Sequence, residues 1–96
     1  MSFKIDLHVH TSYSPCSNLS VRTIEKVALK RGLDCLAITD HNTIEGALEF
    51  KSRVSHLLVI VAEEIKTREG EIIGYFLADR IPPALSVRDT MQEIKR

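Results

Sequence analysis

Apolar and polar residues alternate over residues 3–9 of the chain, and this period of two predicts a β-strand. Residues two apart on a strand point to the same side, so we expect His8 and His10 to project together from one face. Apolar residues at helical spacing follow over residues 20–31, and Gly32 marks the end of that predicted helix.

The rest of the chain continues the alternation of strands and helices. Residues 34–39 are almost wholly apolar, which predicts a strand covered on both faces. The next helix is expected to run to about residue 54, with Asn42 as its N-cap and Glu45 completing a capping box. The remaining predicted elements are a strand over residues 57–66, a turn over 67–70, a hairpin-connected strand over 71–78, and a final helix capped by Ser86.

The element order β-α-β-α-β-β-α predicts an α/β fold with a mainly parallel sheet and right-handed crossovers, in a single domain over residues 1–96. Ligands of such sheets bind at the carboxyl ends of the strands. Polar residues collect at those ends in three successive strands, and unrelated residues would have no reason to gather there. They are His8 with His10, Asp40 with His41, and Glu63 with Glu64.

Composition narrows the function classes. The formal net charge is zero and the charges are interspersed, which argues against a nucleic-acid patch or a membrane-surface helix. The longest apolar run, residues 57–62, is too short to span a bilayer, and the N-terminus does not read as a signal peptide. The two cysteines lack CxxC spacing, and Cys35 is expected in the core. These features predict a cytoplasmic protein.

His8, His10, His41 and Glu64 are candidate metal ligands. Imidazoles with a carboxylate suit zinc, manganese or iron, and a carboxylate among imidazoles is the usual bridge between two metals. Such sites activate water and clamp the oxygens of a transferring phosphoryl group. Two roles are open for Asp40: it could accept a proton from a ligand imidazole, or it could act on bound water.

Three segments resemble the first three motifs of the PHP domain, which is named for polymerase and histidinol phosphatase. They are residues 6–11 (DLHVHT), 38–42 (ITDHN) and 63–70 (EEIKTREG), and their order and spacing match as well. The resemblance covers essentially the whole chain. It implies a distorted seven-stranded β/α barrel with up to three divalent metals, and hydrolysis of phosphate esters on small molecules or nucleotides.

The resemblance also implies ligand roles. His8 and His10 would share one metal, Glu64 would bridge, and His41 would serve a neighbouring metal. Two positions depart from the family pattern: Cys16 is nearest to a loop ligand that is often acidic or histidine, and Glu71 stands where many members have histidine. Both are therefore further candidate ligands.

The later family motifs, a further histidine and a C-terminal Asp-x-His pair, are absent from these residues. A barrel of this type needs about 200 residues or more, so the chain reads as the N-terminal half of one. An open parallel sheet exposes an edge and an apolar face, which predicts self-association or a partner.

Two classes of function remain open at this stage. One is a metal-dependent phosphoesterase or its N-terminal portion, in which Lys66 and Arg68 are candidates for binding substrate phosphate. The alternative is a truncated or degenerate PHP module without catalysis, with a metal-binding, structural or partner-binding role. A nucleophilic enzyme based on Cys16 is the weaker third reading. Glu63 is expected to point away from Glu64, and a shift of the strand alternation by one residue would exchange their roles.

Overall fold

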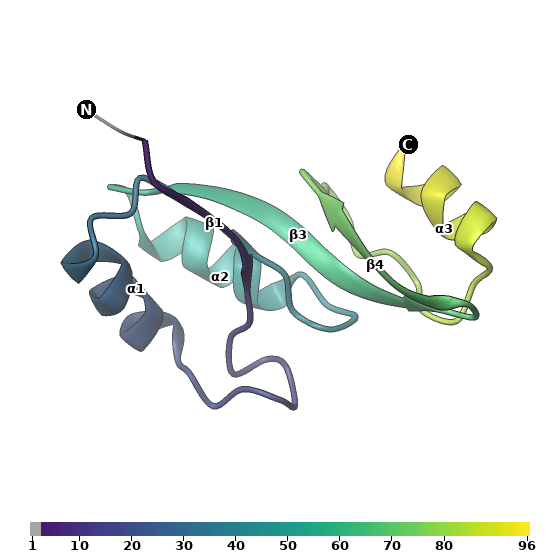
Figure 1. The fold of residues 1–96 in the computed structure, drawn as a ribbon, viewed down its shortest axis with the longest axis horizontal. Helices are drawn as coiled ribbons and strands as arrows, with labels where there is room; N and C mark the ends of the chain where they lie inside the picture. The colour runs from purple at the N-terminus through teal and green to yellow at the C-terminus, as the bar shows by residue number, and fades with distance from the viewer. Residues whose placement is uncertain (1–2) are drawn as a thin grey trace.

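The computed structural model describes residues 3–96 as four strands and three helices in the predicted order (Figure 1). None of the three helices has the length and apolar character needed to cross a bilayer. The elements are β1 (Ile5–Val9), α1 (Val21–Lys30), β2 (Cys35–Ile38), α2 (Glu45–Arg53), β3 (Leu58–Thr67), β4 (Gly70–Tyr75) and α3 (Val87–Ile94).

The strands form one sheet in the order β1-β2-β3-β4. β1, β2 and β3 run parallel, and β4 returns antiparallel to β3 as a hairpin. Asp6 pairs with Leu36 and Val9 pairs with Ile38, so β1 carries one extra residue between these two pairs. Such a bulge bends the strand and re-aims its side chains, and here it lies next to His8.

One face of the sheet packs against α1 and α2, where Leu36, Ile38 and Phe50 are almost wholly buried. The opposite face has no covering helix in residues 3–96. Ile5 and Leu58 both stand in register with Cys35 on that face, and they are 46% and 63% exposed. Cys35 itself is buried, as its apolar surroundings in the sequence predict.

The sheet curls across this uncovered face. The Tyr75 hydroxyl of β4 donates a hydrogen bond of 2.8 Å to the Leu7 carbonyl of β1, although β2 and β3 lie between the two strands in the sheet order. α3 lies beyond β4, at the end of the molecule opposite α1 (Figure 1). The α/β class and element order are confirmed, and the curled, mainly parallel sheet is consistent with part of a barrel.

The predicted cap of α2 is wrong. The helix begins at Glu45, and Asn42 stands outside it in the left-handed region with φ of 56°. Asparagine tolerates this conformation better than most residues. The Asn42 side chain is used elsewhere, because its Oδ1 accepts a 2.9 Å hydrogen bond from the backbone N–H of Lys66. Asn42 therefore fastens the loop after β2 to β3.

Glu63 points away from Glu64, as strand alternation predicts, but it lies in the interior and not in solvent. Its Oε1 accepts a 2.8 Å hydrogen bond from the backbone N–H of Ile81, and Oε2 has no hydrogen-bond partner within residues 3–96. Burial raises the pKa of Glu63, and the Ile81 hydrogen bond and the charge of Arg80 offset only part of that rise.

Replacing Glu63 with glutamine should raise the free energy of unfolding at neutral pH by about 1 kcal/mol, because a neutral amide avoids burying a charge. The folded pKa of Glu63 lies above the unfolded value. The wild type therefore loses stability as pH rises from about 4.3 through the folded pKa. Urea unfolding at a series of pH values measures this difference in stability. The stability gained by Glu63→Gln should vanish in acid and should grow to a plateau as pH rises above the folded pKa. If the stabilities of the two proteins change with pH in parallel, the prediction is wrong.

Candidate metal centre

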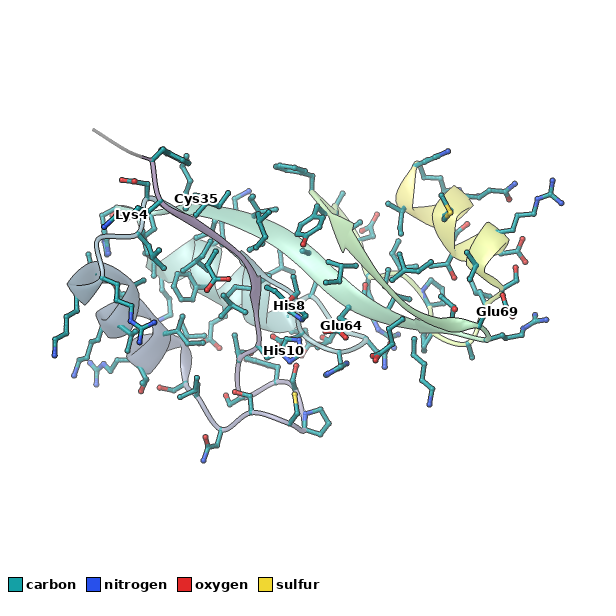
Figure 2. The ribbon with its side chains drawn as sticks, viewed as in Figure 1. Lys4, His8, His10, Cys35, Glu64 and Glu69 are labelled. Carbon is teal, nitrogen blue, oxygen red and sulfur yellow. The ribbon has the colours of Figure 1, made fainter. Side chains whose placement is uncertain are left out.

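Two imidazoles converge on a single carboxylate oxygen at the carboxyl end of β1. His8 Nε2 lies 2.9 Å and His10 Nε2 lies 2.8 Å from Glu64 Oε1. The two rings are tilted, with centroids 5.1 Å apart. Figure 2 shows His8, His10 and Glu64 gathered over the middle of the sheet, well away from Glu69 at the tip of the β3–β4 hairpin. The sequence predicted that these three side chains lie close together, and they do so in the structure.

The segment after β2 brings His41 to the same place. His41 forms a parallel bridge with Glu64, fixed by backbone hydrogen bonds from Glu64 to Asp40 (2.9 Å) and from Asn42 to Glu64 (3.0 Å). The His41 ring packs edge-on against His10 with centroids 4.5 Å apart, and its Nδ1 lies 3.1 Å from Glu71 Oε2. β4 therefore contributes Glu71 beside His41.

Within residues 3–96, the donor atoms form three groups whose members lie within 4.8 Å of one another: His8 with His10 and Glu64, His41 with Glu64 and Glu71, and His10 with Cys16 and His41. Glu64 belongs to two of these groups, which suits a bridging carboxylate. Imidazole and carboxylate donors at this spacing fit zinc, manganese or iron.

The environment of Glu64 favours its charged form. Burial by itself raises the pKa of Glu64, but the hydrogen bonds from His8 and His10 and the nearby His41 outweigh it and hold the pKa below its ordinary value. The side chain is only 13% exposed, so solvent screens its charge poorly. A carboxylate that stays negative at neutral pH and faces three imidazoles is suited to attract a cation.

Asp40 is fully buried, and it accepts hydrogen bonds from segments that carry the candidate ligands. Its Oδ1 accepts hydrogen bonds of 2.6 Å from the Thr11 N–H and the Ser14 hydroxyl, and its Oδ2 accepts one of 2.6 Å from the Thr11 hydroxyl. The Ser14 hydroxyl oxygen in turn accepts from the His41 N–H at 3.0 Å. The predicted contact between Asp40 and a ligand imidazole is not among its hydrogen bonds in residues 3–96. Asp40 instead fastens the residue after His10 and, through Ser14, the backbone of His41.

Gly46 in the first turn of α2 makes room for this arrangement. A Cβ at Gly46 would overlap Asp40 Oδ2 and Thr11 Oγ1 and would press on the Tyr13 ring. We define the Asp40 clamp as Asp40, Thr11, Ser14 and Gly46. Sequence reasoning missed Thr11, Ser14 and Gly46, although a glycine near the start of a helix, where it costs stability, signals a close approach.

The candidate phosphate-binding residues lie at the end of β3 and just beyond it. Lys66 is exposed and pairs across the hairpin with Glu71 of the centre, whereas Arg68 lies in the turn after β3. The Arg68 Nε donates to the Ala84 carbonyl at 3.3 Å. Arg80, which sequence reasoning did not single out, donates from Nε to the Asn42 carbonyl at 2.7 Å, next to His41. A substrate role for Lys66 and Arg68 stays a prediction.

Comparison with known proteins gives the same answer as the motifs. The family model described as the PHP domain matches residues 6–86, which is most of the chain. The chain is 45% identical over 104 aligned residues to the uncharacterized protein MJ1587 of Methanocaldococcus jannaschii. It is 36% identical over 92 residues to the uncharacterized protein MJ0417 of the same organism. The chain belongs to the PHP domain family.

These alignments cover 96% of the chain in both cases, but they span only 61% of MJ1587 and 35% of MJ0417. The matched part includes all five imidazole and carboxylate donors of the centre, since each lies within residues 6–86.

Proposed function

We propose that this chain supplies the metal centre of a metal-dependent phosphoesterase. The observation that carries the proposal is the convergence of His8 Nε2 and His10 Nε2 on one oxygen of Glu64, at 2.9 and 2.8 Å. When bound, divalent zinc, manganese or iron would activate water as the nucleophile and neutralise charge developing on the phosphate.

The residues divide the work by position. His8 and His10 would hold one ion, His41 and Glu71 would hold its neighbour, and Glu64 would be shared, in a domain that would take up to three ions when complete. His8 is 56% and Glu71 is 47% exposed at the side chain, so the ligand set opens to solvent on the side where a phosphorylated small molecule or nucleotide would arrive. The Asp40 clamp keeps the backbones that carry His10 and His41 in place.

The test combines metal content with turnover. Dialysed wild-type protein should retain stoichiometric manganese, iron or zinc by elemental analysis and should hydrolyse p-nitrophenyl phosphate or its bis-ester in a metal-dependent way. A His8→Ala/His10→Ala variant should lose both properties. The control is His56→Ala, because His56 lies outside the three donor groups and its Nε2 is 3.8 Å from Glu25. Hydrolysis that survives the double substitution would rule out this centre.

A second candidate, a PHP module without catalysis, is favoured by the uncovered sheet face. Ile5, Leu7 and Leu58 are each 45% or more exposed there, which gives a second copy or another protein segment an apolar surface to cover. The same experiment separates the two candidates. Stoichiometric metal without hydrolysis of either ester would favour the module, and metal-dependent turnover would favour the enzyme.

A further inference from the structure

The two edges of the sheet differ in how well they are protected. β1 forms one edge, and it carries the bulge between Asp6 and Val9. In this stretch the Leu7 carbonyl accepts a 2.8 Å hydrogen bond from the Tyr75 hydroxyl, and the His8 N–H donates to a side chain at 3.1 Å. Bulges and backbone groups already bonded to side chains discourage the pairing of a further strand. β4 forms the other edge, and no strand within residues 3–96 pairs with its outer side.

The backbone groups that β4 presents at its edge follow from the register of the sheet. Backbone hydrogen bonds of 2.9 and 3.0 Å join Glu64 to the segment after β2, so the backbone of Glu64 faces away from β4. Because this direction alternates along a strand, Ile65 faces β4, and its register partner Ile72 faces β3. The residues on either side of Ile72, and the second residue beyond, turn their N–H and C=O groups outward. They are Glu71, Ile73 and Tyr75, and no hydrogen bond within residues 3–96 occupies these backbone groups.

The sequence of β4 does not protect this edge. Residues 70–75 (GEIIGY) contain no proline and a single charge, at Glu71, and they pair with β3 without a bulge. Phe76 follows directly, with a backbone φ of 58° and 79% of its surface exposed. A bulky residue rarely adopts that left-handed conformation, which here leaves an aromatic ring in solvent at the end of the edge. An unprotected edge is a template for pairing with another chain.

We propose that the β4 edge pairs with β4 of a second copy of this chain, antiparallel and about a two-fold axis at Ile73. Each Ile73 then lies opposite Ile73 of the second copy, and each Glu71 lies opposite Tyr75 of the second copy. These are the residues whose N–H and C=O groups point outward, so every outward group on β4 finds a partner. A register centred on Ile72 would instead set Tyr75 against Glu69 in the hairpin turn. The pairing does not depend on the proposed function.

The side chains of this register are compatible with one another. The single charge on the edge, Glu71, does not face its own copy, so the pairing avoids like charges opposite each other. Phe76 falls beside Gly70 of the second copy, where a Cβ would meet open space and the ring therefore has room. At Gly74, Ile94 of α3 packs against the strand, so α3 covers a face of β4 and leaves its edge open. Because one edge supplies both halves of each match, the occupant is a second copy and not an unrelated strand.

The first test measures mass and places charges at the two-fold axis. Sedimentation equilibrium of the full chain should show a dimer of the 10.8 kDa polypeptide, because a two-fold pairing closes with two copies. Ile73→Lys and Ile73→Glu should each raise the dissociation constant at least about tenfold, since like charges then face each other. An equimolar mixture of the two variants should form the heterodimer, in which opposite charges meet. Ile73→Val, the matched control, should remain a dimer.

A wild-type chain that stays monomeric, or that forms species larger than a dimer, would overturn the proposal. Two results with the charged variants, once circular dichroism has shown them to be folded, would refute it as well. One is that each variant alone stays dimeric, and the other is that their mixture stays monomeric.

The second test needs no variant and covers the case in which the charged variants do not fold. Amide hydrogen exchange in the wild type should slow at Glu71, Ile73 and Tyr75 as the protein concentration rises through the dissociation constant. Exchange at Ile72 and Gly74, which face β3, should not change over that range. Exchange at the three outward residues that is independent of concentration would show that the edge is free and would overturn the proposal.

Discussion

Glu64→Gln should lower the affinity for manganese by more than about a hundredfold, as measured by calorimetric titration of metal-free protein. Glu64 contributes to two of the three donor groups, and its carboxylate stays charged because its pKa lies below the ordinary value. Glutamine keeps the size of the side chain and removes the charge. Even groups outside the ligand sphere contribute about 10- to 100-fold to metal affinity, so a shared ligand should contribute more.

The neighbouring Glu63→Gln variant is the matched control. It makes the same chemical change one residue earlier on β3, on the opposite face and outside every donor group. Its manganese affinity should match that of the wild type, so that a loss confined to Glu64→Gln reports on the ligand. If Glu64→Gln binds manganese within a few-fold of the wild type, Glu64 is not a metal ligand.

Asp40→Ala should destabilise the fold by about 3 to 5 kcal/mol, a large part of the 5 to 15 kcal/mol typical of a whole domain. The substitution leaves the Thr11 N–H, the Thr11 hydroxyl and the Ser14 hydroxyl without their buried acceptor. Each unsatisfied buried donor costs about 1 to 3 kcal/mol. Urea unfolding followed by circular dichroism measures the change. Asp40→Asn retains one acceptor oxygen and should lose less.

Two further variants serve as comparisons for Asp40→Ala. Asp34→Asn alters an exposed aspartate whose Oδ2 accepts from the Lys4 N–H, and it should change stability by less than about 0.5 kcal/mol. Gly46→Ala disturbs the Asp40 clamp from α2, because the added Cβ would overlap Asp40 Oδ2. This variant should also be strongly destabilised. An Asp40→Ala protein as stable as Asp34→Asn would show that the clamp does not support the fold.

Much of the fold follows from local pattern. Alternation over residues 3–9 and the apolar run at residues 34–39 predicted β1 and β2, and helical spacing predicted α1. These signals succeed because side-chain direction repeats every two residues in a strand and every 3.6 in a helix. The meeting of His8, His10 and Glu64 was predictable for a related reason. Parallel strands bring their carboxyl ends to one edge, whatever the details of packing.

Contacts between distant residues lay beyond that local pattern. Asn42 was predicted as a helix cap and instead accepts from the Lys66 N–H, 24 residues away. Glu63 was expected to face away from Glu64, and its burial depends on the loop that carries Ile81. The partner in such a hydrogen bond is the backbone group that packs opposite the side chain. That group is distant in the sequence, so the local pattern of residues does not predict it.

The sequence by itself determined the family, the order of strands and helices, and the residue types that gather at the metal centre. The tertiary structure alone decided how those residues are used: Asp40 as a buried hydrogen-bond acceptor, and Cys16 with its sulfur beside His10 Nδ1. The physical reason is that a ligand's type is a property of one residue. Its orientation, burial and hydrogen-bond partner are properties of segments that meet only when the sheet curls and the loops close over its edge.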